Sequence, residues 1–365
     1  MPKLETPLQL SPVFKPKIWG RRDLAPLYPD SWTTRRGKTV TNRYPGIDPK
    51  WKEPVGESWL TGDDAKFLNG PVAGRTLGEV AREYGPELTG SAAKSKEFPI
   101  LTKFIFTSDW LSVQVHPDDD YAGTHEGFRG KCEMWYILDT KPEAAFLLGL
   151  KHGTSKAALR EQLRQGKARE SLQLFKPEAG EAIFVPPGSV HALGPGMILF
   201  EAEQNSDVTY RLDDFGRLGP DGKPRPLHIE KALDVTRPEL PAYRALPKLT
   251  FREPFGSRRY VLASRFFAVE EWTLQKTGSF QGSMERVEAF TILSGEGRVE
   301  TAAGWFGYRP GEGWVIPPAT PHYRLAPEID TVLLKFYVPN IEKDFLRPLA
   351  DRKLSPDEIK KVVFD

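Results

Sequence analysis

The segment Gly180-Glu-Ala-Ile-Phe-Val-Pro-Pro-Gly-Ser-Val-His191 is the clearest guide to the fold of this 365-residue chain. Its apolar run predicts a buried strand and Pro-Pro-Gly predicts a tight turn, after which a new strand begins at His191. The turn fixes where the imidazole enters the space between strands. The segment recurs as Gly311-Glu-Gly-Trp-Val-Ile-Pro-Pro-Ala-Thr-Pro-His322, with the Gly, the Glu, both prolines and the His identical. This repeat predicts two related β-units in tandem.

The sequence upstream of each copy repeats as well, because Glu133-Met-Trp-Tyr-Ile-Leu138 parallels Glu288-Ala-Phe-Thr-Ile-Leu293. Short runs rich in Val, Ile, Phe, Tyr and Trp predict strands at 104–106, 110–116, 134–138, 182–185, 197–203, 260–263, 266–274, 289–293, 314–316 and 331–338. Helical periodicity is clearest at 77–84, 156–165 and 355–363. We therefore predict a mostly β protein of two jelly-roll-like β-barrels, with a small helical subdomain inserted in the first. The proline-rich stretch 236–247 predicts a boundary between domains 1–238 and 239–365.

Composition narrows the class of protein. The 51 basic and 49 acidic residues leave a net charge of +2, which favours neither nucleic acid nor an anionic membrane surface. No apolar run approaches the length of a membrane span. The single cysteine, Cys132, excludes an intramolecular disulfide and fits a reducing cytoplasm. We expect a monomer or a weak homodimer, because no large apolar stripe indicates a stronger interface.

Metal-ligating side chains gather around Ser112-Val-Gln-Val-His-Pro-Asp-Asp119. Alternation along a strand places Gln114 and His116 on one face, together with Ser112. The same rule puts Glu133 on one face with Lys131 and Trp135. An amide oxygen, a carboxylate and two imidazoles, the second from His191, form a nitrogen and oxygen site suited to zinc or another divalent metal.

Other candidates for metal ligation are weaker. We interpret His125, His152 and His228 as ordinary hydrogen-bonded histidines. The second unit offers His322 and Glu288 without a Gln-x-His pair, so we expect no metal there. Cys132 alternates with the ligand face and is expected to be a small buried hydrophobe rather than a nucleophile.

The segment Gly180–His191 has the spacing of the second cupin motif, although Pro195 replaces the usual terminal Asn. Several motifs resemble those of type I mannose-6-phosphate isomerases: Ser112–Asp119, Gly130-Lys-Cys-Glu-Met-Trp-Tyr136, Glu203-Gln-Asn-Ser-Asp-Val-Thr-Tyr-Arg-Leu212, Ile18-Trp-Gly20, Gly56-Glu-Ser-Trp59 and Leu227-His-Ile-Glu-Lys-Ala-Leu233. The resemblance runs from about Phe14 to Val235 and implies a pair of cupin barrels. One departure is Arg21-Arg22, where the family commonly has a second glycine after Gly20.

The resemblance implies a zinc-dependent enzyme, with one zinc ion per chain, that interconverts mannose 6-phosphate and fructose 6-phosphate. By position, the metal ligands carry over to Gln114, His116, Glu133 and His191. Arg211 matches the family's active-site arginine. Further active-site positions fall on Lys131, Ser112, Lys103 and Glu201.

Aldose–ketose isomerisation moves a proton between C1 and C2 through a cis-enediolate, and therefore needs a base. The sequence leaves three candidates: Lys131 with a depressed pKa, Glu201, or a metal-bound hydroxide. Arg211, Ser112 and Lys103 can bind the phosphate, while Arg211 can equally act on the enediolate or simply pair with Asp207, Asp213 or Asp214.

Two other functions stay open at this point. One is a different cupin enzyme, either another sugar isomerase or a metal-dependent oxygenase. The other is a non-enzymatic cupin that senses sugar phosphates.

Overall fold

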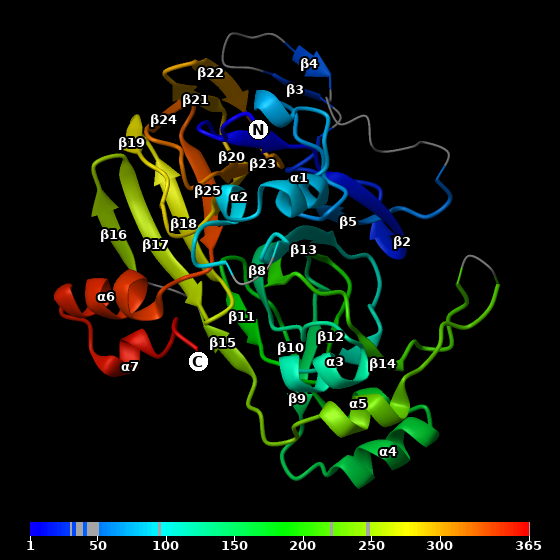
Figure 1. Ribbon diagram of the computed structural model, residues 1–365. Coiled ribbons are helices and arrows are strands. Elements are labelled where there is room, and N and C mark those ends of the chain that lie inside the picture. Colours follow the sequence, from blue (N-terminus) through cyan, green and yellow to red (C-terminus); the bar gives the residue numbers. More distant parts are fainter. Residues whose placement is uncertain are drawn as a thin grey trace.

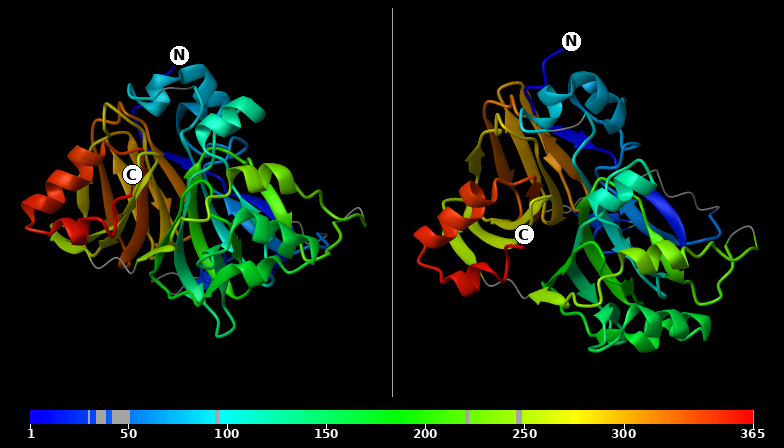
Figure 2. Two further views of the ribbon diagram at one scale, coloured as in Figure 1. Left: turned by 90° about the horizontal axis from the view of Figure 1, so that it is seen from below. Right: turned by 60° about the horizontal axis from the view of Figure 1, so that its bottom comes forward.

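The computed structural model describes residues 1–29, 31–33, 39–41, 51–93, 96–219, 222–245 and 249–364. The protein is mostly β, and antiparallel sheets form two units that lie side by side (Figures 1 and 2). The prediction of a mostly β fold is therefore confirmed. Residues 246 and 247 of the predicted boundary stretch lie outside the described residues.

The first unit contains two facing sheets. A seven-stranded sheet has the order β15 (Tyr243–Ala245), β11 (Ala182–Val185), β8 (Glu133–Thr140), β13 (Met197–Gln204), β6 (Ile100–Phe106), β5 (Val55–Trp59) and β2 (Val13–Arg21). A five-stranded sheet has the order β10 (Leu172–Phe175), β9 (Phe146–Leu150), β12 (His191–Leu193), β7 (Val113–Val115) and β14 (Tyr210–Asp213). A separate hairpin pairs β3 (Ser31–Thr33) with β4 (Thr39–Thr41).

The second unit also has two sheets. The larger has the order β1 (Leu8–Leu10), β23 (Gly313–Ile316), β20 (Glu288–Ser294), β25 (Thr331–Tyr337), β18 (Ala268–Leu274), β17 (Gly256–Ala263) and β16 (Thr250–Glu253). The smaller has the order β19 (Gly278–Phe280), β24 (Tyr323–Pro327), β21 (Gly297–Thr301) and β22 (Gly304–Tyr308). Strand β1 comes from the N-terminal end of the chain and pairs with β23, so the second unit includes residues far from it in sequence.

The seven-stranded sheet of the first unit is buried on both faces. One face packs toward the five-stranded sheet through side chains such as Trp135 and Leu199. The opposite face packs on the second unit, where Phe200 contacts Phe336 with ring centroids 5.7 Å apart. Alternating residues of one strand thus stabilise two cores, and this rigid sheet supports the site. The division at residues 238 and 239 stays a prediction.

Helices are few and lie mostly in the first unit: α1 (Leu77–Tyr84), α2 (Pro86–Thr89), α3 (Asp119–His125), α4 (Lys156–Arg164), α5 (Ile229–Val235), α6 (Arg347–Asp351) and α7 (Pro356–Ile359). Side chains of Thr76, Ser155 and Ser355 cap the N-termini of α1, α4 and α7. Helix α3 lies between the two ligand-bearing segments, and Asp118 caps its N-terminus by accepting a hydrogen bond from the backbone N–H of Tyr121 at 3.0 Å.

No helix among the described residues is long and apolar enough to cross a membrane.

Candidate metal centre

The candidate metal centre lies between the two sheets of the first unit. On the five-stranded sheet, Gln114 of β7 stands opposite His191 of β12 on one side and Arg211 of β14 on the other. His116 follows directly after β7. The facing seven-stranded sheet contributes Glu133 at the start of β8. Residues that are distant in sequence therefore converge because neighbouring and facing strands bring them to the same place.

The Pro-Pro-Gly turn fixes the position of His191. Ser189 donates its backbone N–H to the Pro186 carbonyl oxygen at 3.1 Å, which closes the turn. Gly188 has a φ of +90°, and a Cβ there would lie 2.9 Å from the Val235 carbonyl oxygen, so glycine is required. The Gly188 N–H donates to the His116 carbonyl oxygen at 2.9 Å. The turn thus ties together the two segments that carry the histidines.

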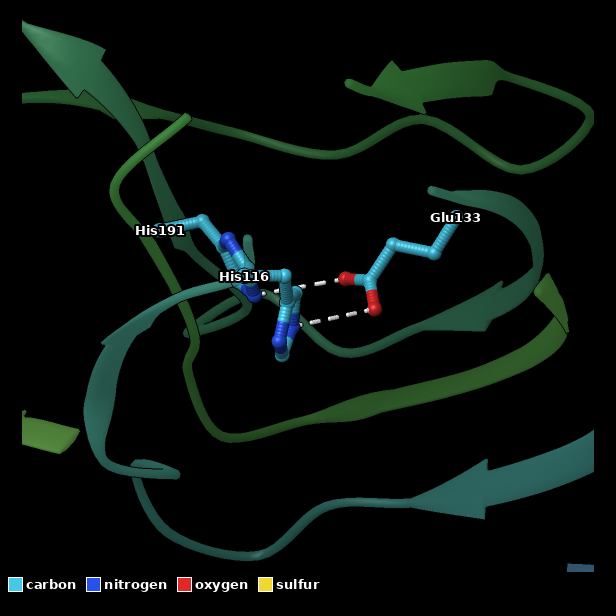
Figure 3. A group of neighbouring side chains, drawn as sticks. All are labelled: His116, Glu133 and His191. Carbon is cyan, nitrogen blue, oxygen red and sulfur yellow. Dashed lines mark ion pairs between the residues drawn. The ribbon is translucent and has the colours of Figure 1, made fainter. Parts of the chain in front are cut away.

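His116, Glu133 and His191 face one another in a buried cluster (Figure 3). The Nε2 atoms of His116 and His191 each lie 3.2 Å from a different oxygen of Glu133. All three residues are at most 2% exposed, so water cannot satisfy their polar atoms. The alternation predicted from the sequence therefore does place these ligand groups together.

The proton positions in this cluster suit a metal ion. The Nδ1–H groups of His116 and His191 donate to the carbonyl oxygens of Val208 (2.9 Å) and Ser189 (3.0 Å). Because a carbonyl oxygen can only accept, each ring in its neutral form directs its Nε2 lone pair at the cluster. His116 Nε2 and both Glu133 oxygens are buried and make no hydrogen bond among the described residues. Buried acceptors that converge in this way fit a divalent cation.

Electrostatics point the same way. Burial lowers the pKa of His191 to about 4, against the opposing effect of the Glu133 carboxylate. Burial alone raises the pKa of a carboxyl group, but His116 and Lys131 hold the pKa of Glu133 well below its ordinary value. The imidazole of His191 is therefore neutral and the carboxylate charged near neutral pH, which are the forms that bind metals.

The balance of buried charges also suits a cation. The carboxylates of Glu57, Glu133 and Glu201 outnumber the ammonium groups of Lys103 and Lys131, even though burial raises the pKa of the neighbouring Glu203 well above its ordinary value. A divalent cation offsets this excess of negative charge.

Gln114 completes the predicted ligand set. Its side-chain amide lies 3.2 Å from His191 Nε2. Rotation of the amide by half a turn places the oxygen where the nitrogen now lies, so the group can present its oxygen to a metal. The Ser112 hydroxyl donates to the Gln114 oxygen at 3.2 Å. Ser112 thus shares the ligand face, as the alternation predicts, and its contact in the structure is with Gln114.

The expectation that Lys131 has a depressed pKa is wrong. Its Nζ lies 2.8 Å from Glu203 and 3.4 Å from Glu133. Burial alone lowers the pKa of a lysine, but these carboxylates outweigh it and raise the pKa of Lys131 above its ordinary value. Lys131 is therefore an ammonium group, able to donate hydrogen bonds but not to accept a proton.

Strand β13 supplies two buried carboxylates, of which the sequence predicted one. Glu201 lies 3.0 Å from Lys103 Nζ and accepts a hydrogen bond from Trp135 Nε1 at 3.1 Å. Glu203 lies between Lys103 and Lys131, and it is not among the site residues predicted from the sequence. Alternation was the missed signal, because Glu203 stands two residues from Glu201 and shares its face.

Arg211 has no counterion among the described residues. Its Nη1 donates to the Pro226 carbonyl oxygen at 3.1 Å, while its Nε is buried without a partner. Asp214, a predicted alternative partner, instead accepts from Arg217 at 2.6 Å and from Arg225 at 2.7 Å. Burial and the nearby Arg225 lower the pKa of Arg211. A half-buried guanidinium with free donors suits an anionic ligand.

The remaining candidates behave as ordinary residues. His322 is exposed and its Nε2 lies 2.9 Å from the Ser279 hydroxyl. Glu288, the counterpart of Glu133 in the second unit, is ion-paired with Lys335 at 2.7 Å, so an ammonium group already neutralises its carboxylate. Cys132 is 1% exposed in the core, and burial raises the pKa of its thiol well above its ordinary value. The metal-compatible groups of the described residues accordingly lie in the first unit and all include Glu133.

Comparisons with known proteins identify a family of related chains. Residues 8–153 match the model of the phosphomannose isomerase type I catalytic domain. The chain is 34% identical over 319 residues to the probable mannose-6-phosphate isomerase GmuF of Bacillus subtilis, covering 85% of this chain and 93% of that protein. It is 35% identical over 270 residues to the mannose-6-phosphate isomerase of Streptococcus mutans, covering 73% and 83%.

A solved structure of mannose 6-phosphate isomerase from Bacillus subtilis superposes with a TM-score of 0.78 at 28% identity, covering 91% of this chain and 99% of that one. The cupin-type fold expected from the sequence is thus confirmed. The chain belongs to the type I mannose-6-phosphate isomerase family.

Proposed function

We propose that this protein is a metal-dependent isomerase that interconverts mannose 6-phosphate and fructose 6-phosphate. The observation that carries the proposal is the buried convergence of His116, Glu133 and His191, one strand away from the unpaired guanidinium of Arg211. The cluster can hold a metal cation, and the guanidinium can hold an anion such as the phosphate group of a sugar phosphate. The names of the relatives supply the identity of the sugar.

The proposed metal is zinc, one ion per chain, held by Gln114, His116, Glu133 and His191. Two imidazoles, a carboxylate and an amide oxygen are nitrogen and oxygen donors of the kind that zinc binds. Metals that prefer soft ligands bind sulfur instead. When bound, the ion supplies Lewis-acid stabilisation of the negative charge that develops on O1 or O2 of the sugar.

Glu201 of β13 and Lys131, which lies just before β8, have different roles in the proposed proton chemistry. We assign Glu201 as the base that takes the C2 proton of the aldose and returns it to C1 of the cis-enediolate. Lys131 is excluded from that role by its raised pKa, and its ammonium group donates a hydrogen bond to the sugar oxygens instead. Burial of both residues keeps water away from the carbanion-like intermediate.

The phosphate is assigned to Arg211, with the Ser112 hydroxyl as a second contact. Arg211 lies opposite Gln114 on the neighbouring strand and has donors to spare. Lys103 is buried, with both Glu201 and Glu203 at 3.0 Å, and adds positive charge beside the cluster. The proposal needs a small-molecule substrate only, and the buried single cysteine suits a reducing cytoplasm.

The experiment that tests this function incubates the zinc-loaded protein with mannose 6-phosphate in heavy water. We expect fructose 6-phosphate in a coupled assay, with solvent deuterium at C1 to the extent that the base exchanges its proton. Binding of the sugar phosphate without turnover would favour a sensor. Oxygen uptake with iron in the protein would favour an oxygenase. Either result would overturn the proposal.

A further inference from the structure

Glu203 is a buried carboxyl group of the network, in contact with two lysines, that the proposed chemistry leaves without a role. We infer that it is a positioning residue, which holds the ammonium groups of Lys103 and Lys131 in place beside the metal centre. The inference rests on the proposed function and deepens it, because it explains how two lysines are held in a site that also binds a cation.

The contacts of Glu203 are divided evenly between the two lysines. Its side chain is fully buried, so its partners must come from the protein. One oxygen lies 3.0 Å from Lys103 Nζ and the other 2.8 Å from Lys131 Nζ. A side chain that uses each oxygen for a different ammonium group fixes the distance between those groups.

Glu203 and Glu133 compete for the ammonium group of Lys131. Its Nζ is closer to Glu203, at 2.8 Å, than to Glu133, at 3.4 Å. Among the described residues, Glu133 is the carboxylate that contacts both histidines of the cluster. Without Glu203, the ammonium group is drawn onto Glu133 and displaced from its position toward the substrate. Glu203 therefore keeps the lysine available while leaving Glu133 to the metal.

The register of the strands places two acidic side chains against each other, a pairing that costs stability. Glu203 of β13 stands directly opposite Glu133 of β8. Burial, with the neighbouring carboxylates of Glu201 and Glu133, raises the pKa of Glu203 well above its ordinary value against the effect of both lysines. The groups Glu133, Glu201 and Glu203 also form a cluster that can hold a second cation, but the two ammonium groups already occupy it. An acidic pair that costs stability and organises two amines is typical of a functional site.

The test compares Glu203→Leu with Glu203→Gln in the zinc-loaded enzyme. Leucine removes both contacts, whereas the glutamine oxygen still contacts one ammonium group. We expect kcat for mannose 6-phosphate to fall about tenfold or more in the leucine variant, since a misplacement of about 1 Å can cost more than this. The glutamine variant should keep most of the activity. Both should keep one zinc per chain, and the glutamine variant should melt no lower than the wild type.

Glu181→Gln is the matched control. Glu181 is a buried glutamate of the same unit, but its ion pair is with Arg244 at 2.6 Å and it contacts neither lysine. We expect its kcat and KM to equal those of the wild type. If the leucine variant does not fold, Glu203→Asn replaces it, because the shorter side chain withdraws the amide by one methylene and should lose the same activity.

Equal kcat in the leucine (or asparagine) and glutamine variants would overturn the inference, as would loss of zinc in step with loss of activity. Inactivity of the wild-type enzyme toward mannose 6-phosphate would instead refute the proposed function. The two failures are therefore distinguishable.

Discussion

Replacing Arg211 by methionine should abolish most activity while leaving the metal in place. Methionine keeps much of the aliphatic packing and removes a half-buried guanidinium that has no counterion among the described residues. Each hydrogen bond from a charged donor contributes about 1.5–3 kcal/mol, so the loss of one or two such bonds to phosphate amounts to about 3 kcal/mol. That loss corresponds to roughly a hundredfold decrease in kcat/KM.

The thermal stability of Arg211→Met should rise or stay unchanged. Burial lowers the pKa of Arg211, which shows that the free protein holds this charge at a cost. We expect the melting temperature of Arg211→Met to equal or exceed that of the wild type. Arg160→Met is the matched control, because Arg160 pairs with Glu230 on the surface, away from the cluster.

A steady-state assay with phosphorylated and unphosphorylated mannose separates the two roles proposed for Arg211. If the guanidinium binds phosphate, the hundredfold penalty should vanish with mannose. If it stabilises the enediolate, the penalty should be the same for both sugars. A kcat/KM within twofold of the wild type for mannose 6-phosphate would refute the reasoning and remove Arg211 from the site.

Three further predictions follow from the buried groups. In metal-stripped protein, lowering the pH from about 6.5 to about 4 should reduce the free energy of unfolding by up to about 3 kcal/mol, because the unfolded chain gains a proton that buried His191 does not accept. Denaturant melts of His191→Gln should lack this part of the pH dependence. An identical pH dependence in that variant would contradict the prediction. Cys132 should react with a thiol reagent only at the rate of unfolding, since burial raises the pKa of its thiol, and fast labelling of the native enzyme would show otherwise. His322→Ala should keep full zinc content and full kcat, because the imidazole is exposed and bonded to Ser279; loss of zinc would place a metal in the second unit.

The sequence predicted which side chains would cluster, because their orientation depends on local rules. Alternation points Gln114 and His116 from the β7 segment, and Glu133 from β8, into the space between the two sheets, and the Pro-Pro-Gly turn places His191. These rules need no knowledge of which strands are neighbours. The same locality explains why α1 and α4, with their capping residues, begin where they were predicted to begin.

The errors have equally physical origins. Helix α3 is short and polar, so it shows no apolar period, and only the acidic residues at its start, Asp118 to Asp120, signalled it. The pKa of Lys131 depends on Glu203, a residue of another strand that lies beside it only in the folded chain. Pairing of β1 with β23 joins the two ends of the sequence, and no local pattern specifies such a contact.

The proposed activity depends most on the metal centre. A zinc titration of chelated protein tests this dependence most directly. We predict that protein shown to be metal-free by emission spectroscopy does not isomerise mannose 6-phosphate. Added zinc should restore activity linearly until one equivalent per chain is bound, and His191→Ala should not recover under the same conditions. Full activity in the metal-free wild type would contradict the account.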